Sequence, residues 1–180
     1  MANKNKPMTT YVAFLRGIGG TDTKIKMQVL IEAFEGMGFR NVKTVIASGN
    51  VIFDAEPSGE ADLERIIEKA LPDAVGFGAD TIVYTFDELQ RMARSSPLRD
   101  IKATPKIRPF VTFLKEIPKS MPKFSGKGFK LLGRKGRAVF STVDLSAAAT
   151  PDLMGLLDRQ YGKKTTTRSW MTIEKILQKT

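Results

Sequence analysis

The chain has 180 residues and a formal net charge of +10, and it contains neither cysteine nor histidine. Because thiol and imidazole groups are absent, the sequence excludes cysteine nucleophiles, Ser-His-Asp triads, disulfides and ordinary zinc, haem or iron–sulfur sites. A general base would have to be Asp, Glu, Lys or Tyr. We expect no cofactor and no resident metal, and no catalytic residue stands out.

The positive charge is concentrated in the second half. Residues 1–100 hold 12 Lys or Arg and 14 Asp or Glu, whereas residues 101–180 hold 17 and 5. This one-sided excess predicts an anionic partner, either nucleic acid or a phosphorylated small molecule. The sequence shows no signal segment and no apolar run long enough to span a bilayer, so we expect a cytoplasmic protein without a membrane partner. Its oligomeric state is left open.

The first half predicts a β-α-β-β-α-β order, which is that of a ferredoxin-like unit. The apolar pattern predicts a strand at 10–16, a helix at 27–37, strands at 42–47 and 51–53 joined by a turn at 48–50, a helix centred on 63–71 and a strand at 81–85. A short helix begins near Thr85, which has capping-box spacing to Glu88.

The second half predicts a similar β-(short α)-β-β-α-β unit followed by a last helix. Its predicted elements are a strand at 109–114, strands at 129–132 and 138–141, a helix capped by Thr150 that stops at Gly162, a strand at 163–167 and a helix at 170–179. The predicted fold class is therefore α+β. It comprises two ferredoxin-like (βαββαβ) subdomains, residues 1–100 and 101–180, with antiparallel sheets covered by helices, plus a C-terminal helix.

Three blocks carry a family resemblance: residues 11–18 with 24–27, residues 38–53, and residues 166–172. The chain resembles the uncharacterised family DUF1697, which implies two ferredoxin-like subdomains in a bacterial protein and supplies no activity or cofactor. Two departures stand out. Family members usually have Asn-Val between Gly-Ile and the glycine pair, whereas here Ile18 is followed directly by Gly19-Gly20 and the segment is one residue shorter. The family's usual Arg-Asn-Trp-Asn-Thr is Arg168-Ser169-Trp170-Met171-Thr172 in this chain. A ligand that those asparagines contact in other members would be altered or lost in this chain.

The glycine-rich turn after the first strand is a candidate anion site. Bare backbone, a following helix N-terminus and nearby cations together suit a bound anion. Neither a Walker motif nor a dinucleotide fingerprint is present, and a purely structural loop is the alternative interpretation. The candidate ligand-binding residues here are Arg16, Gly17, Gly19, Gly20, Lys24 and Lys26.

Four further residues are candidates for binding a ligand. Ser48 and Asn50 belong to the predicted hairpin turn, for which a tight turn alone is the alternative. Arg168 precedes the last helix and would either clamp a phosphate or pair with a carboxylate of the first half. Trp170 either contacts a ligand or anchors that helix in the core.

A basic run from Lys102 to Arg137 contains a single acidic residue, Glu116. Phenylalanines 110, 113, 124 and 129 are interleaved with it, as in sheets that bind single-stranded nucleic acid by charge and stacking. However, Phe110 and Phe113 differ by an odd step and should not share a strand face. The alternative is a solvated basic surface over core phenylalanines. The candidate nucleic-acid-binding residues are Lys127, Lys130, Arg134, Lys135 and Arg137.

These observations favour a non-enzymatic anion-binding module that engages phosphates of nucleic acid or of a nucleotide-like ligand. The alternative is an enzyme acting on a small phosphorylated or carboxylated metabolite held between the subdomains, with Arg16, Lys24 and Arg168 as the anion clamp. A third hypothesis is a partner-binding protein whose sheet edge pairs with another chain.

Overall fold

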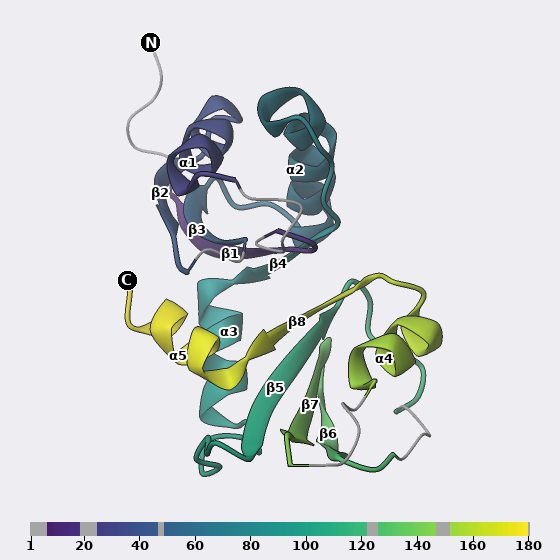
Figure 1. The fold of residues 1–180 in the computed structure, drawn as a ribbon. Helices are drawn as coiled ribbons and strands as arrows, with labels where there is room; N and C mark the ends of the chain where they lie inside the picture. The colour runs from purple at the N-terminus through teal and green to yellow at the C-terminus, as the bar shows by residue number, and fades with distance from the viewer. Residues whose placement is uncertain (1–6, 19–24, 47–48, 122–125, 147–151, 180) are drawn as a thin grey trace. The chain divides into compact units, whose positions relative to one another are not determined.

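The computed structural model describes residues 7–18, 25–46, 49–121, 126–146 and 152–179. It contains two four-stranded antiparallel sheets, with strand orders β2-β3-β1-β4 and β6-β7-β5-β8 (Figure 1). Both orders are those of a ferredoxin-like unit, which confirms the predicted α+β class and the two subdomains. The chain divides into two compact units between Leu89 and Gln90. Independent domains at residues 1–100 and 101–180 stay a prediction.

The first unit has the full predicted element order. It consists of β1 (Thr9–Leu15), α1 (Met27–Gly36), β2 (Arg40–Thr44), β3 (Asn50–Ala55), α2 (Glu60–Val75) and β4 (Thr81–Thr85). Alternate residues of β1 (Tyr11, Ala13 and Leu15) join one core with apolar residues of α1 and α2. Rings of Phe34, Phe39 and Phe53 fill that core, with the Phe39 and Phe53 centroids 4.4 Å apart.

Two carboxylates of α2 accept hydrogen bonds from backbone N–H groups on the outer side of β4, which is an edge strand of its sheet. The Val83 N–H donates to Glu64 Oε1 at 2.9 Å, and the Thr81 N–H donates to Glu68 Oε1 at 2.7 Å. Glu64 is only 5% exposed. Its carboxylate accepts the hydrogen bond that the carbonyl of a neighbouring strand would otherwise accept from this edge N–H. The edge is therefore closed from within the unit.

The short helix α3 (Phe86–Arg94) follows β4 directly. Its cap is the predicted one, since Thr85 Oγ1 accepts a hydrogen bond from the Glu88 N–H at 3.1 Å.

The second unit is built from β5 (Ile107–Leu114), β6 (Phe129–Lys135), β7 (Ala138–Asp144), α4 (Leu153–Tyr161), β8 (Thr165–Ser169) and α5 (Trp170–Leu177). The prediction of a short helix between the first two strands of this unit is wrong for the described residues, because residues 115–121 and 126–128 are not helical. Proline and glycine in these segments disfavour a helix. Thr150, the predicted cap of the next helix, lies outside the described residues. Asp152 caps α4 by accepting from the Gly155 N–H at 3.0 Å, so the helix begins two residues later than expected. Gly162 ends it in the left-handed conformation, as predicted.

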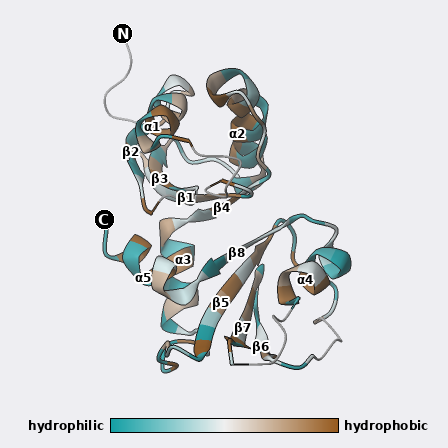
Figure 2. Ribbon diagram, viewed as in Figure 1, coloured by the Kyte–Doolittle hydropathy of each residue, from teal (hydrophilic) through white to brown (hydrophobic). Residues whose placement is uncertain are grey.

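Helices cover both faces of the second sheet. Leu114, Val139 and Val143 pack with Leu153 and Leu157 of α4. On the other face, α5 packs against β5 and β8. Residues 111–114 of β5 are therefore all buried, and Figure 2 shows β5 as mostly hydrophobic apart from a hydrophilic band near its start. No helix in the described part of the chain combines the length and apolarity needed to cross a membrane.

We predict that Glu64→Ala lowers the free energy of unfolding by about 1–3 kcal/mol, because it removes the acceptor of a buried N–H. Chemical denaturation monitored by circular dichroism measures the change. Lys69→Ala on the exposed side of α2 is the matched control and should change stability by less than about 0.5 kcal/mol. Equal effects of the two substitutions would contradict the role of Glu64.

Candidate functional site

The predicted anion site lies at the end of β1, where three segments of the first unit converge. The Leu15 N–H donates to the Gly49 carbonyl at 2.8 Å, and the Arg16 N–H donates to the Asp80 carbonyl at 2.8 Å. The end of β1 is thus held between the β2–β3 hairpin and the residue before β4. The structure therefore brings Arg16 and Gly17 together with the hairpin residues Gly49 and Asn50.

Several of the predicted ligand-binding residues at this end do not contribute to the described geometry. Gly19, Gly20, Lys24 and Ser48 lie outside the described residues. Lys26 is exposed and stands at the N-cap of α1, but its side chain makes no capping hydrogen bond. Gly17 is exposed with φ +76°, a left-handed conformation that glycine adopts without strain. The ligand-binding role of these residues stays a prediction.

The hairpin turn differs from the predicted one in its details. The predicted turn at 48–50 falls between β2 and β3, and Ser48 lies outside the described residues, but Asn50 is already the first residue of β3 and pairs with Phe14 of β1. Asn50 is 1% exposed, and its Nδ2 donates to the Val45 carbonyl at 2.9 Å. This bond ties the start of β3 to the end of β2, so the Asn50 side chain has a structural task within the hairpin.

Gly49 is required where it stands. Its φ is +68°, and a Cβ atom there would lie 2.8 Å from Cβ of Ile18. The hairpin can approach the end of β1 this closely only because residue 49 lacks a side chain.

The second unit repeats this arrangement with other side chains. The Leu114 N–H donates to the Arg137 carbonyl at 2.8 Å, and the Lys115 N–H donates to the Lys164 carbonyl at 3.3 Å. Leu114-Lys115 therefore corresponds to Leu15-Arg16, and Lys164 corresponds to Asp80. An acidic residue of the first unit is thus replaced by a cation, which makes this end of the second sheet more positive.

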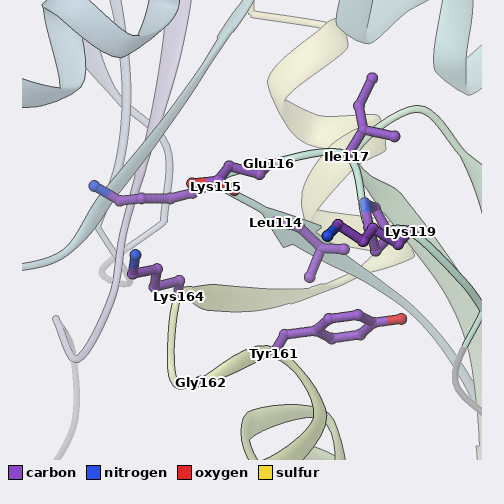
Figure 3. Close-up of a pocket in the computed structure, with 9 residues that line it drawn as sticks. Leu114, Lys115, Glu116, Ile117, Lys119, Tyr161, Gly162 and Lys164 are labelled. Carbon is purple, nitrogen blue, oxygen red and sulfur yellow. The ribbon is translucent and has the colours of Figure 1, made fainter.

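A hollow of about 410 Å³ opens at this end of the second unit. Apolar residues (Leu114, Ile117, Pro118 and the Tyr161 ring) supply part of its surface, and three lysines, Lys115, Lys119 and Lys164, also line it (Figure 3). Glu116 is the one carboxylate among the residues that line it. The lining residues are Leu114, Lys115, Glu116, Ile117, Pro118, Lys119, Tyr161, Gly162 and Lys164.

Tyr161 connects this pocket to the core beneath α4. Its ring packs against the apolar cluster of that core, and its hydroxyl donates to the Ser120 carbonyl at 3.4 Å. Burial raises the pKa of Tyr161, while the positive charge of Arg134 acts in the opposite direction. The phenol is therefore neutral at physiological pH.

The five predicted nucleic-acid-binding residues surround β6, the edge strand of the second sheet. Lys130 pairs with Thr142 and Lys135 with Ala138, so both project on the face opposite α4, and both are exposed. Arg134 pairs with Val139 on the α4 face, where one of its Nη atoms donates to the Gly136 carbonyl at 2.8 Å. Arg137 donates to the Lys115 carbonyl at 3.4 Å, and Lys127 is exposed before the strand.

The interleaved phenylalanines are core residues where the structure describes them. Phe113 is fully buried, and Phe110 and Phe129 pack with the cluster beneath α4. Phe110 and Phe113 face opposite sides of β5, as the odd step predicts. Phe124 lies outside the described residues. Among the described residues, the phenylalanines interleaved with these cations thus pack wholly or partly into the core.

Arg168 and Trp170 both belong to the second unit. Arg168 is 9% exposed, and its Nη1 donates to Thr166 Oγ1 at 2.7 Å and to the Thr167 carbonyl at 2.9 Å. Burial lowers the pKa of Arg168 to about 10, which leaves it charged at neutral pH. Trp170 is 5% exposed at the start of α5, the position of a core anchor. Ligand binding by either residue stays a prediction.

The carboxylates do not gather into a metal site in the part of the chain that the structure describes. Asp54 accepts hydrogen bonds from Thr10 Oγ1 and Asn41 Nδ2, at 2.7 and 2.6 Å. Asp144 accepts from Ser146, whose hydrogen bonds lower the pKa of that carboxyl group. Both carboxylates thus have structural partners.

Sequence analysis did not single out Lys164 or Tyr161. The available signal was the Leu-cation pair that ends the first strand of each half, Leu15-Arg16 and Leu114-Lys115. The correspondence of Lys164 with Asp80 needs the observed start of the last strand, because the predicted strand at 163–167 begins two residues before β8 does.

Comparisons with known proteins support the fold. The family model described as "Protein of unknown function (DUF1697)" matches residues 8–124. The solved structure of the conserved bacterial protein SP0830 from Streptococcus pneumoniae is similar, with a TM-score of 0.73 and 20% identity over 96% of this chain and 98% of that one. At this identity the similarity shows the fold alone. No curated protein matches the chain significantly.

We predict that Gly49→Ala lowers the free energy of unfolding by about 1–3 kcal/mol, because alanine at positive φ is strained and its Cβ would clash with Ile18. Thermal and denaturant unfolding measure the effect. The control is Gly36→Ala at the end of α1, where nothing lies within 4 Å of the added Cβ and stability should stay level or rise. A neutral Gly49→Ala would contradict the close approach.

We predict that Tyr161 titrates above the usual tyrosine pKa, and that Arg134→Gln raises its pKa further by removing a nearby cation. Ultraviolet titration of tyrosinate measures both values. Because the chain has three tyrosines, subtracting the curve of Tyr161→Phe isolates this one. A pKa that falls in Arg134→Gln would contradict the electrostatic interaction between the two groups.

Proposed function

Since the chain belongs to DUF1697, a family of unknown function, we propose a function from its own chemistry: it is a non-enzymatic anion-binding protein whose second unit engages the phosphates of nucleic acid or of a nucleotide-like ligand. The observation that carries the proposal is the row of exposed cations along β6, an edge strand.

Local charge supports this proposal. Lys127, Lys130 and Lys135 have no carboxylate partner among the described residues. The sequence places only Glu116 among the cations from Lys102 to Arg137. Cations without internal counter-ions attract a polyanion from solution. When they bind it, the counter-ions condensed on the polyanion are released, which favours binding.

The packing of the phenylalanines bears on the mode of binding. Because Phe110, Phe113 and Phe129 are committed to the core, β6 itself would contact phosphates rather than stacked bases. Such binding depends little on sequence and strongly on salt. The alternative is an enzyme acting on a small phosphorylated or carboxylated metabolite; among the described residues, no group of three or more acidic side chains gathers where it could hold a metal ion.

We predict that short single-stranded RNA and DNA bind the protein with an affinity that falls linearly on a log–log plot against salt concentration. Lys130→Gln with Lys135→Gln should reduce the slope by about 0.7 for each phosphate that the double variant no longer neutralises. Filter binding at several salt concentrations measures it. Lys69→Gln on α2 is the control and should leave the slope unchanged. The absence of salt-sensitive retention of either nucleic acid would overturn the proposal.

A further inference from the structure

The two units differ at the outer edge of their last strand. In the first unit, the Val83 N–H points away from β1 and donates to Glu64 of α2 at 2.9 Å. The Thr81 N–H donates to Glu68 of the same helix at 2.7 Å. In the second unit, β8 is the corresponding edge strand, beside β5 (Figure 1). Its outward N–H groups need acceptors of the same kind.

The register of β8 shows that the Thr167 N–H points outward. The Lys115 N–H donates to the Lys164 carbonyl, and in an antiparallel pair every second residue makes such inward bonds. Thr167 lies three residues after Lys164 and therefore corresponds to Val83 of the first unit. Its carbonyl, which points the same way, accepts from Arg168 Nη1 at 2.9 Å. No described residue accepts a hydrogen bond from the Thr167 N–H.

The sequence before α4 lacks the carboxylate that closes the first unit. Aligning α2 and α4 on the glycines that end them brings the buried Leu71 and Leu157 to the same position. Glu64 then corresponds to Thr150, which cannot supply a carboxylate. Residues 145–151 contain neither Asp nor Glu. The second unit thus keeps the outward N–H of its edge strand without the acidic side chain that accepts from it in the first.

Positive charge accompanies this N–H. The Arg168 guanidinium reaches the outer edge, since it donates to the Thr167 carbonyl, and Lys164 is exposed just before the strand. The one acidic residue of α4, Asp158, accepts from Thr165 Oγ1 at 2.9 Å, at the start of β8. A carboxylate at Thr167 would therefore gain a charge-assisted hydrogen bond and the attraction of a nearby guanidinium.

We propose that the outer edge of β8 binds a carboxylate group supplied from outside the chain, which accepts from the Thr167 N–H as Glu64 accepts from Val83 in the first unit. The site lies on the opposite edge of the sheet from β6 and is separate from the surface of the proposed function. The carboxylate belongs either to an acidic segment of a partner protein or to a free small molecule, and the two sources are distinguished below.

Amide hydrogen exchange of the full chain, followed by NMR, tests whether this edge is open. The Thr167 N–H should exchange at least about tenfold faster than the Val83 N–H, because only the second has an acceptor. Equal protection of the two groups would overturn the proposal. This comparison needs no variant and no ligand.

Binding is measured from the amide shifts of the full chain during titration. The probes are glutarate, an alternating valine–glutamate peptide and its valine–glutamine counterpart. The Thr167 signal should shift saturably, and the glutamine peptide should bind at least about tenfold more weakly than the glutamate peptide. A response to the peptide alone assigns the site to an acidic protein segment, and a response to glutarate assigns it to any accessible carboxylate. Both outcomes support the proposal. No saturable shift with either probe overturns it, as does tighter binding of inorganic phosphate.

Substitutions separate the backbone donor from the side chains. Thr167→Pro removes the outward N–H and spares the inward bonds, so the Kd read from the Ser169 amide should rise by about tenfold or more. Thr167→Ala keeps the N–H and should retain binding. Arg168→Gln should raise the Kd by about three- to tenfold, whereas Lys135→Gln on β6 is the control and should leave it unchanged. If Thr167→Pro does not fold, Arg168→Gln and the exchange rates decide the test. A Kd that neither Thr167→Pro nor Arg168→Gln changes overturns the proposal.

Discussion

Two backbone hydrogen bonds at the end of the first strand organise each unit. Leu15 and Arg16 donate to the Gly49 and Asp80 carbonyls, and Leu114 and Lys115 donate to those of Arg137 and Lys164. These bonds fix the tip of the hairpin and the start of the last strand at one end of the sheet. Whatever side chains the chain places there are brought together, because buried backbone groups must pair within the protein.

The two units use this shared framework differently. In the first, Gly49 permits the hairpin to pack against Ile18 with no side chain between them. In the second, the described residues 115–121 and 126–128 after β5 form no helix like that of the first unit, and the strand end opens into a hollow. A cation stands where the first unit has Asp80, and an aromatic ring from α4 lies nearby. The same topology therefore supports a closed turn in one unit and a positively charged pocket in the other, which agrees with the view that function belongs to sites rather than to folds.

One edge of the first sheet is covered by carboxylates, whereas one edge of the second sheet carries cations. The carboxylates of Glu64 and Glu68 accept hydrogen bonds from the backbone N–H groups of Val83 and Thr81 in β4. At the far edge of the second sheet, β6 instead carries Lys130, Arg134 and Lys135. Charged edge strands resist pairing with other sheets. Under the proposed function the exposed Lys130 and Lys135 would also contact phosphates, so protection of the edge and binding of an anion would be compatible uses of one strand.

The sequence alone determined the order of elements in the first unit and, apart from the short helix predicted after β5, in the second, because apolar periodicity, the Thr85 cap and the Gly162 stop are local signals. It also excluded thiol and imidazole chemistry, and it located the positive charge in the second half. Only the tertiary structure decided that Asn50 ties a hairpin and that Asp152 caps α4. It alone brought Leu114, Lys164 and Tyr161 to one hollow, because residues about 50 positions apart meet only through strand pairing across the sheet, which no local pattern encodes.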